Sequence, residues 1–238
     1  MALPTIETPR YELTLPSSDT IVSFRPFLVK EEKILMIAME SNDNKEIISA
    51  TREILKACTY DKIDVNKLPL FDIEYIFLQI RAKSVGEISK FKILCPDDKQ
   101  TYADVELDLT KVDVQVNDEH TNNIVIDEDK KLGIVFNYPN LEMTQAGFDV
   151  DNIDADTLFD IMISTIDYIY EGEKLFPAKD STKEELKTFI ESLPQKTFEK
   201  IRVFFDTMPQ LRHEIEVENP KTKVKNKITL KGIRDFFQ

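Results

Sequence analysis

The chain has 238 residues, of which 44 are acidic and 31 are basic, so its formal net charge is −13. A hydrophobic fraction of 42% with 32% charged residues and only 5 glycines is typical of a folded globular protein, and it excludes disordered and fibrous classes. The acidic balance argues against nucleic acid as a partner, because phosphate backbones repel a chain of this charge.

The first residues and the cysteine content indicate a cytoplasmic protein. The start of the chain lacks the basic region and apolar run of a signal peptide, and no segment reaches the roughly 18 apolar residues that span a bilayer. The chain has only two cysteines, Cys58 and Cys95, whereas secreted proteins of this size usually carry several paired ones. We therefore expect a reducing cytoplasm, no membrane contact and no disulfide.

The first part of the chain predicts a hairpin followed by helices. Residues 11–15 and 20–24 are β-favouring runs on either side of a turn that contains Pro, Ser and Asp. Residues 31–40 and 47–58 carry apolar side chains at helical spacing, and Cys58 lies on the second of these stripes. We expect this thiol to be a core residue, because a nucleophile needs exposure and a basic neighbour.

The middle of the chain predicts one central helix and then mostly strands. Residues 71–81 follow a Leu-Pro dipeptide and are apolar on several sides, so we expect neighbours on more than one flank. Alternation over residues 87–116 predicts a hairpin that turns near Cys95 and Pro96. A second β region is expected at 124–126 and 132–138.

The last part of the chain returns to helices and ends in strands. Acidic residues at 149–156 precede a helical stripe over 158–169 and are expected to cap it. Residues 181–184 form a predicted capping box for a helix whose stripe covers 186–193. The remaining predicted elements are a helix at 198–208 and strands at 214–218 and 225–230.

These elements predict an α+β fold in which helices pack with short antiparallel hairpins. A Leu-Pro dipeptide, an apolar helix and a hairpin occur twice, with Pro69 and Pro96 spaced like Pro194 and Pro220, which suggests two repeated halves. The predicted division is a first segment of hairpin, helices and helix-hairpin unit at 1–110, a β-rich connector at 111–148, and a second segment of helices and hairpin at 149–238.

Two patterns resemble metal sites, and both lack ligands. The turn from Cys95 to Asp98 resembles the first knuckle of a zinc ribbon, but Asp98 stands where the second cysteine belongs. The corresponding turn at 219–222 contains no cysteine. The acidic runs at 127–129 and 149–151 lack the glycine of a calcium loop. We therefore predict no metal and no cofactor.

No pattern predicts a catalytic residue. His120 lies in a polar loop and His213 in a strand, and neither has a motif-spaced Ser or Cys partner. The chain has no Gly-rich phosphate loop and no nucleophile elbow. The lysines between Lys221 and Lys231 lack interleaved aromatic residues, so we interpret them as a solvated hairpin rather than a nucleic-acid site. The sequence predicts a protein that is not an enzyme.

One short segment offers a candidate partner contact. Phe24, Arg25, Pro26 and Phe27 follow the first hairpin, and an Arg with two aromatic residues around a Pro can form an exposed anchor. The alternative is that both phenylalanines fill the core beside the first helix, as burial statistics favour.

Several long segments resemble the baseplate hub subunit of T-even-type contractile-tailed bacteriophages. They are residues 25–41, residues 63–87 and the closing segment from 208–213 through 230–237. The resemblance implies a protein that is made in the host cytoplasm, helps to assemble the central hub of the tail baseplate and has no catalytic residues.

Three roles follow as hypotheses. An assembly chaperone would cover a surface of a hub or tape-measure protein until assembly, and the acidic surface and helical stripes suit that binding. A permanent structural subunit of the hub would use the same surfaces in the virion tail baseplate, alone or as a homo-oligomer. A metal-dependent enzyme would need clustered carboxylates.

Overall fold

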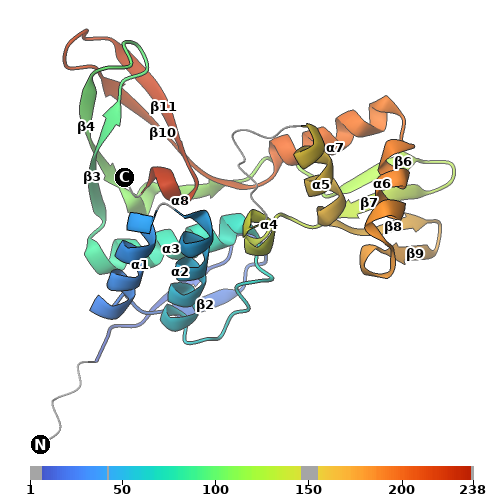
Figure 1. The fold of residues 1–238 in the computed structure, drawn as a ribbon, viewed down its shortest axis with the longest axis horizontal. Coiled ribbons are helices and arrows are strands. Elements are labelled where there is room, and N and C mark those ends of the chain that lie inside the picture. The colour runs from blue at the N-terminus through green and yellow to red at the C-terminus, as the bar shows by residue number, and fades with distance from the viewer. Residues whose placement is uncertain (1–6, 42, 146–154, 237–238) are drawn as a thin grey trace, which may run out of the picture. The chain divides into compact units, whose positions relative to one another are not determined.

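The computed structural model describes residues 7–41, 43–145 and 155–236. The chain forms two compact units (Figure 1). The first unit comprises residues 1–115 together with 210–238, and the second comprises residues 116–209. This differs from the predicted division at 110 and 148. The C-terminal hairpin belongs to the first unit because its first strand pairs with a strand from the first half of the chain.

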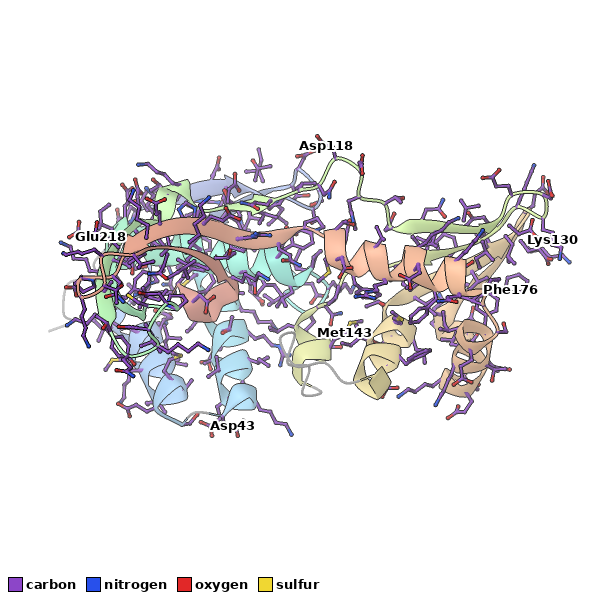
Figure 2. The ribbon with its side chains drawn as sticks, turned by 90° about the horizontal axis from the view of Figure 1, so that it is seen from above. Asp43, Asp118, Lys130, Met143, Phe176 and Glu218 are labelled. Carbon is purple, nitrogen blue, oxygen red and sulfur yellow. The ribbon has the colours of Figure 1, made fainter. Side chains whose placement is uncertain are left out.

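The first unit begins with a hairpin and three helices. The hairpin consists of β1 (Tyr11–Thr14) and β2 (Ile21–Phe24), and the helices are α1 (Val29–Ser41), α2 (Asn44–Cys58) and α3 (Leu70–Val85). α1 and α2 lie side by side (Figure 1). Asp43, labelled in Figure 2, caps α2 by accepting a hydrogen bond from the backbone N–H of Lys45 at 2.8 Å.

α3 is the central helix of the first unit, as its apolar pattern predicted. Its side chains from Ile73 to Ile80 are buried on several sides. Its first turn also contains a buried carboxylate, Asp72, which accepts hydrogen bonds from the backbone N–H and the hydroxyl of Ser17 in the β1–β2 turn. Burial raises the pKa of Asp72, and the Ser17 hydrogen bonds oppose that rise. Asp72 therefore ties the first hairpin to the central helix.

The rest of the first unit is made of hairpins. β3 (Ile88–Leu94) pairs with β4 (Tyr102–Asp108). β10 (Gln210–Glu218) lies between β11 (Lys225–Lys231) and the short β5 (Asp113–Gln115), and α8 (Gly232–Asp235) follows. The two hairpins turn at the positions that the sequence predicted.

The second unit contains a four-stranded antiparallel sheet with helices packed against it. The strands are β6 (Asn123–Asp127), β7 (Leu132–Phe136), β8 (Ile166–Glu171) and β9 (Lys174–Pro177), in that order across the sheet. The helices are α4 (Leu141–Gln145), α5 (Ala155–Thr165), α6 (Lys183–Glu191) and α7 (Gln195–Thr207). Phe136, Met162, Ile190, Ile201 and Phe204 are fully or almost fully buried in one shared core.

The α+β prediction is confirmed, with three local corrections. The helix expected to reach residue 169 ends at Thr165, and β8 starts at Ile166. The capping box lies one residue later than predicted, with Thr182 as the cap and Glu185 as its partner. The described residues do not form two repeated lobes, because α7 belongs to the second unit whereas the hairpin that follows it belongs to the first.

Candidate binding surfaces

The segment predicted as an exposed anchor is largely buried. Phe24 is 2% exposed and Arg25 is 8% exposed. The guanidinium of Arg25 forms an ion pair with Glu31, with Nη2 and Oε1 2.8 Å apart, and its Nη1 donates to the carbonyl of Pro26 at 2.9 Å. The prediction of an exposed anchor is therefore wrong for these two residues. Phe24 is buried because its ring is apolar, and Arg25 is buried because it is the counter-ion of the buried Glu31.

In the Arg25–Glu31 pair, hydrogen bonds and charge outweigh the effect of burial on the pKa values of both groups. Burial by itself would lower the pKa of Arg25, but the hydrogen bond and charge of Glu31 raise it overall. Burial would raise the pKa of Glu31, but hydrogen bonds from Arg25 and from the backbone N–H of Leu28 lower it overall. Both groups are therefore charged at neutral pH.

Cys58 lies beside this ion pair and is a core residue, as predicted. It is fully buried and unpaired, and Arg25 Nη1 lies 3.7 Å from its sulfur. Burial raises the pKa of Cys58 to about 11, although the charge of Arg25 opposes the rise. The thiol is therefore protonated at neutral pH and has little nucleophilic character.

The other two residues of the predicted anchor are half-buried. The ring of Phe27 lies 5.6 Å from that of Phe77, and its backbone N–H donates to the hydroxyl of Ser84 at 2.7 Å. Both partners belong to α3. Pro26 is also half-buried and supplies its carbonyl to Arg25. The segment thus joins the first hairpin to the helices, which is the structural alternative that the sequence left open.

The turn at Cys95, which resembles a zinc knuckle, and the turn at Asn219 have similar backbone hydrogen bonds. In the first, the N–H of Cys95 donates to the carbonyl of Thr101 and the N–H of Lys99 donates back to Cys95. In the second turn, which is one residue shorter, the N–H of Asn219 donates to the carbonyl of Val224 and the N–H of Lys223 donates to the carbonyl of Asn219. Lys99 and Lys223 both adopt positive φ, at 52° and 63°.

A carboxylate joins these turns. Asp97 accepts hydrogen bonds from the amide of Asn219 at 2.9 Å, the amide of Asn226 at 3.1 Å and the hydroxyl of Thr222. These bonds, that of Asn219 foremost, lower the pKa of Asp97. Asn219 is itself fully buried. One carboxylate and three donors thus connect the two turns.

The chemistry of the paired turns does not fit zinc. Burial and the nearby charges of Asp97 and Asp98 raise the pKa of Cys95, whereas zinc binding needs a thiolate. Within the described ranges, no group of three or more His, Cys, Asp and Glu side chains could hold a metal ion. The acidic run at 149–151 lies outside the described residues.

The lysines of the C-terminal hairpin face glutamates on the neighbouring strand. Lys225 Nζ lies 2.7 Å from Glu216 Oε1, and Lys223 Nζ lies 3.5 Å from Glu218 Oε1. Glu218 is at the turn end of β10 (Figure 2). The local charge is therefore partly neutralised, so the hairpin is a weaker attractant for phosphate than its lysine content suggests.

His120 is a structural residue of the second unit. Its ring stacks on those of Tyr138 and Phe204, with centroids 5.6 and 5.3 Å away. The hydroxyl of Thr207 donates to the carbonyl of Val203, so its oxygen accepts from Nδ1–H of His120 at 2.9 Å. Nε2 of the ring then accepts from the Tyr138 hydroxyl at 3.0 Å. Both nitrogens are satisfied in the neutral ring.

We expect the second unit to lose stability as the pH falls below the ordinary histidine pKa of 6.5. Burial lowers the pKa of His120, so the unfolded chain binds a proton more readily than the folded one. The stabilisation is present above pH 6.5 and is lost as the pH falls toward the lowered value. Urea denaturation at pH 7.5 and 5.5 should show a smaller pH effect for His120→Gln than for the wild type. His213→Gln is the control; an equal effect in both variants would contradict the assignment to His120.

The second unit has a groove beside α7. It has a volume of about 420 Å³. One wall is the outward face of α7, which presents Lys196, Lys200, Val203 and Thr207 at helical spacing, and Ile124 and Val125 of β6 line the groove as well. Val203 is 54% exposed. The exposed area of the lining is mainly apolar, but charged side chains of both signs also line the groove: Lys196, Lys200, Glu119 and Glu199.

The strand beside this groove is an edge strand. β6 pairs only with β7 in the described sheet. The N–H of Phe136 donates to the carbonyl of Asn122, and the alternation of antiparallel pairing then directs the backbone groups of Asn123 and Val125 away from β7. The Val125 carbonyl accepts from Lys200 Nζ at 2.9 Å. A side chain therefore occupies a backbone acceptor that a further strand could use.

No helix in the described part of the chain combines the length and apolar character needed to cross a bilayer. The observations define an α+β protein of two compact units, with apolar side chains exposed on α1, α7 and β9. The chain matches a family model described as T4 bacteriophage base plate protein over residues 8–238. It therefore belongs to this family, which confirms the resemblance to phage baseplate proteins and associates the chain with the tail baseplate. No curated protein and no solved structure matches it.

Proposed function

We propose that this chain is a non-enzymatic assembly protein of the baseplate hub, which binds a hub or tape-measure protein during tail assembly in the host cytoplasm. The groove beside α7 carries the proposal, because it combines exposed apolar side chains with an edge strand, β6, that pairs only with β7 in the described sheet. Grooves of this kind bind extended segments of partner proteins by strand addition. Family membership supports other baseplate proteins as the partners.

The proposed occupant is an extended segment of the hub or tape-measure protein that pairs with β6. Its backbone N–H would replace Lys200 Nζ at the carbonyl of Val125. An aliphatic side chain of the segment would rest on Val203 and Ile124. The displaced ammonium of Lys200 would then be free to meet an acidic residue of the partner.

Replacing Val203 with Glu is expected to weaken partner binding by about tenfold or more, since it places a charge on the apolar part of the groove wall where the partner's side chain would rest. Val203 is half-exposed, so the fold should tolerate the change. Leu175→Glu is the matched control, because Leu175 is 62% exposed on β9 of the same unit, next to Phe176 (Figure 2). Binding would be measured by titration against purified hub and tape-measure proteins. Equal loss in both variants, or no loss in either, would count against the groove.

Mass spectrometry of hub intermediates and mature particles from one infection distinguishes an assembly chaperone from a permanent structural subunit. An assembly chaperone is present in the intermediates and lost from the particles. A permanent structural subunit of the hub, which is the second candidate, is retained in fixed copy number. The groove serves either role, but retention would contradict the chaperone.

A further inference from the structure

α1 has an inward face that packs on the first unit and an outward face that does not. Glu31, Ile34, Leu35 and Ala38 are buried or half-buried, and their spacing of three, one and three places them on one side of the helix. The opposite side carries three large apolar residues that are mainly exposed: Val29 at 82%, Met36 at 58% and Ile37 at 55%. Such a stripe on a soluble helix favours association.

Two opposite charges flank the exposed apolar pair. Lys33 lies one turn before Met36 and Ile37, and Glu40 lies one turn after them. Both charged side chains are exposed, and neither forms an ion pair with any described residue. From Lys33 to Glu40 the face therefore presents a cation, an apolar centre and an anion in order along the helix.

We propose that this face binds the same face of a second copy of the chain, with the two α1 helices antiparallel. A two-fold axis beside Met36 and Ile37 brings Lys33 of each copy opposite Glu40 of the other. The same operation packs Met36 of one copy against Ile37 of the other. The pattern is thus complementary to itself in charge and in polarity, whereas a face with charges of a single sign would repel its own copy.

The contact is small, so the dimer is weak. α1 has 13 residues and is about 20 Å long. One such helix pair lies below the 1,200 Å² or so that marks the low end of stable interfaces, so the complex belongs among transient ones. Met36 suits this role, because its flexible thioether adapts to a surface that is also solvated. The inference holds whether the chain is a chaperone or a permanent subunit.

Sedimentation of the full chain tests the proposal, over roughly 10 µM to 1 mM because a small interface requires high concentration. The wild type should shift toward a dimer as concentration rises and back toward a monomer as salt is added. Ile37→Glu should abolish the shift. Lys33→Glu and Glu40→Lys should each weaken it, and the double variant with both charges exchanged should restore it. Val85→Glu, at a position 64% exposed on α3, should leave it unchanged.

Two results of the sedimentation experiment would overturn the proposal. One is a wild type that stays monomeric at every concentration, and the other is a dimer that Ile37→Glu leaves intact. Failure of the exchanged double variant to recover would exclude the antiparallel register. Loss of binding to a hub protein in Ile37→Glu, with a monomeric wild type, would assign the face to another protein. The Val203→Glu experiment is independent, since that residue lies in the other unit.

Discussion

Replacing Arg25 with Ala is expected to lower the free energy of unfolding of the first unit by about 3 kcal/mol or more. The change leaves Glu31, which is 2% exposed, without its main counter-ion. Lys30 Nζ lies 3.5 Å from the carboxylate but is mostly in solvent, so it compensates only in part. Chemical denaturation of the wild type and the variant at pH 7 measures the difference.

Arg202→Ala is the matched control for this prediction. Arg202 also pairs with a carboxylate, Asp206 at 3.9 Å, but both side chains are more than 60% exposed. We expect a loss of less than about 0.5 kcal/mol there, because solvent screens the pair. Similar losses in the two variants would show that burial does not decide the cost.

The Arg25 effect should also depend on pH in a defined direction. The pKa of Glu31 is lowered from its ordinary value of 4.5, so its ion pair stabilises the fold above pH 4.5. That contribution is lost as the pH falls through the lowered pKa. The difference between wild type and Arg25→Ala should therefore shrink in acid.

Replacing Phe204 with Ala is expected to cost the second unit about 3–5 kcal/mol, as large-to-small changes in an aromatic core do. Phe204 is 1% exposed. Its ring stacks with those of Phe136 and His120 at 5.2 and 5.3 Å and meets Phe205 edge-on at 4.9 Å. The substitution leaves a cavity between α7 and the sheet. Hydrogen exchange of the α7 amides would report the loss.

Val203→Ala is the neighbouring control, because it removes apolar atoms from a side chain that is already half in solvent. Its cost should be well below that of Phe204→Ala. Comparable costs would mean that the aromatic stack contributes little to the stability of the unit.

Most local elements were predictable because the sequence repeats its apolar residues with one clear period. α1, α2 and α7 have such stripes, and each lies within a few residues of its expected range. The pattern failed after Thr165. Ile166 and Ile169 continue the helical spacing, yet they belong to β8, because pairing with β7 satisfies their backbone in the sheet.

The candidate sites were less predictable, because they depend on contacts between distant residues. The sequence predicted Arg25 as an exposed anchor, whereas in the structure its guanidinium pairs with Glu31 and lies beside Cys58. The groove beside α7 could not be predicted from the sequence, because residues of α7 and β6 line it together. No local pattern of residues indicated that β6 is an edge strand. An edge is defined by which strand is missing beside it, and that is a property of the whole sheet.

The sequence by itself determined the α+β class, the core position of Cys58 and the family of the chain. These features were predictable because burial patterns and family resemblance depend directly on residue types and their spacing. Only the tertiary structure decided that Asp97 joins two turns more than 120 residues apart, and that the C-terminal hairpin completes the first unit. Those contacts join residues that are far apart in the chain. Such pairing does not produce a periodic pattern of residue types, so it cannot be predicted from local sequence.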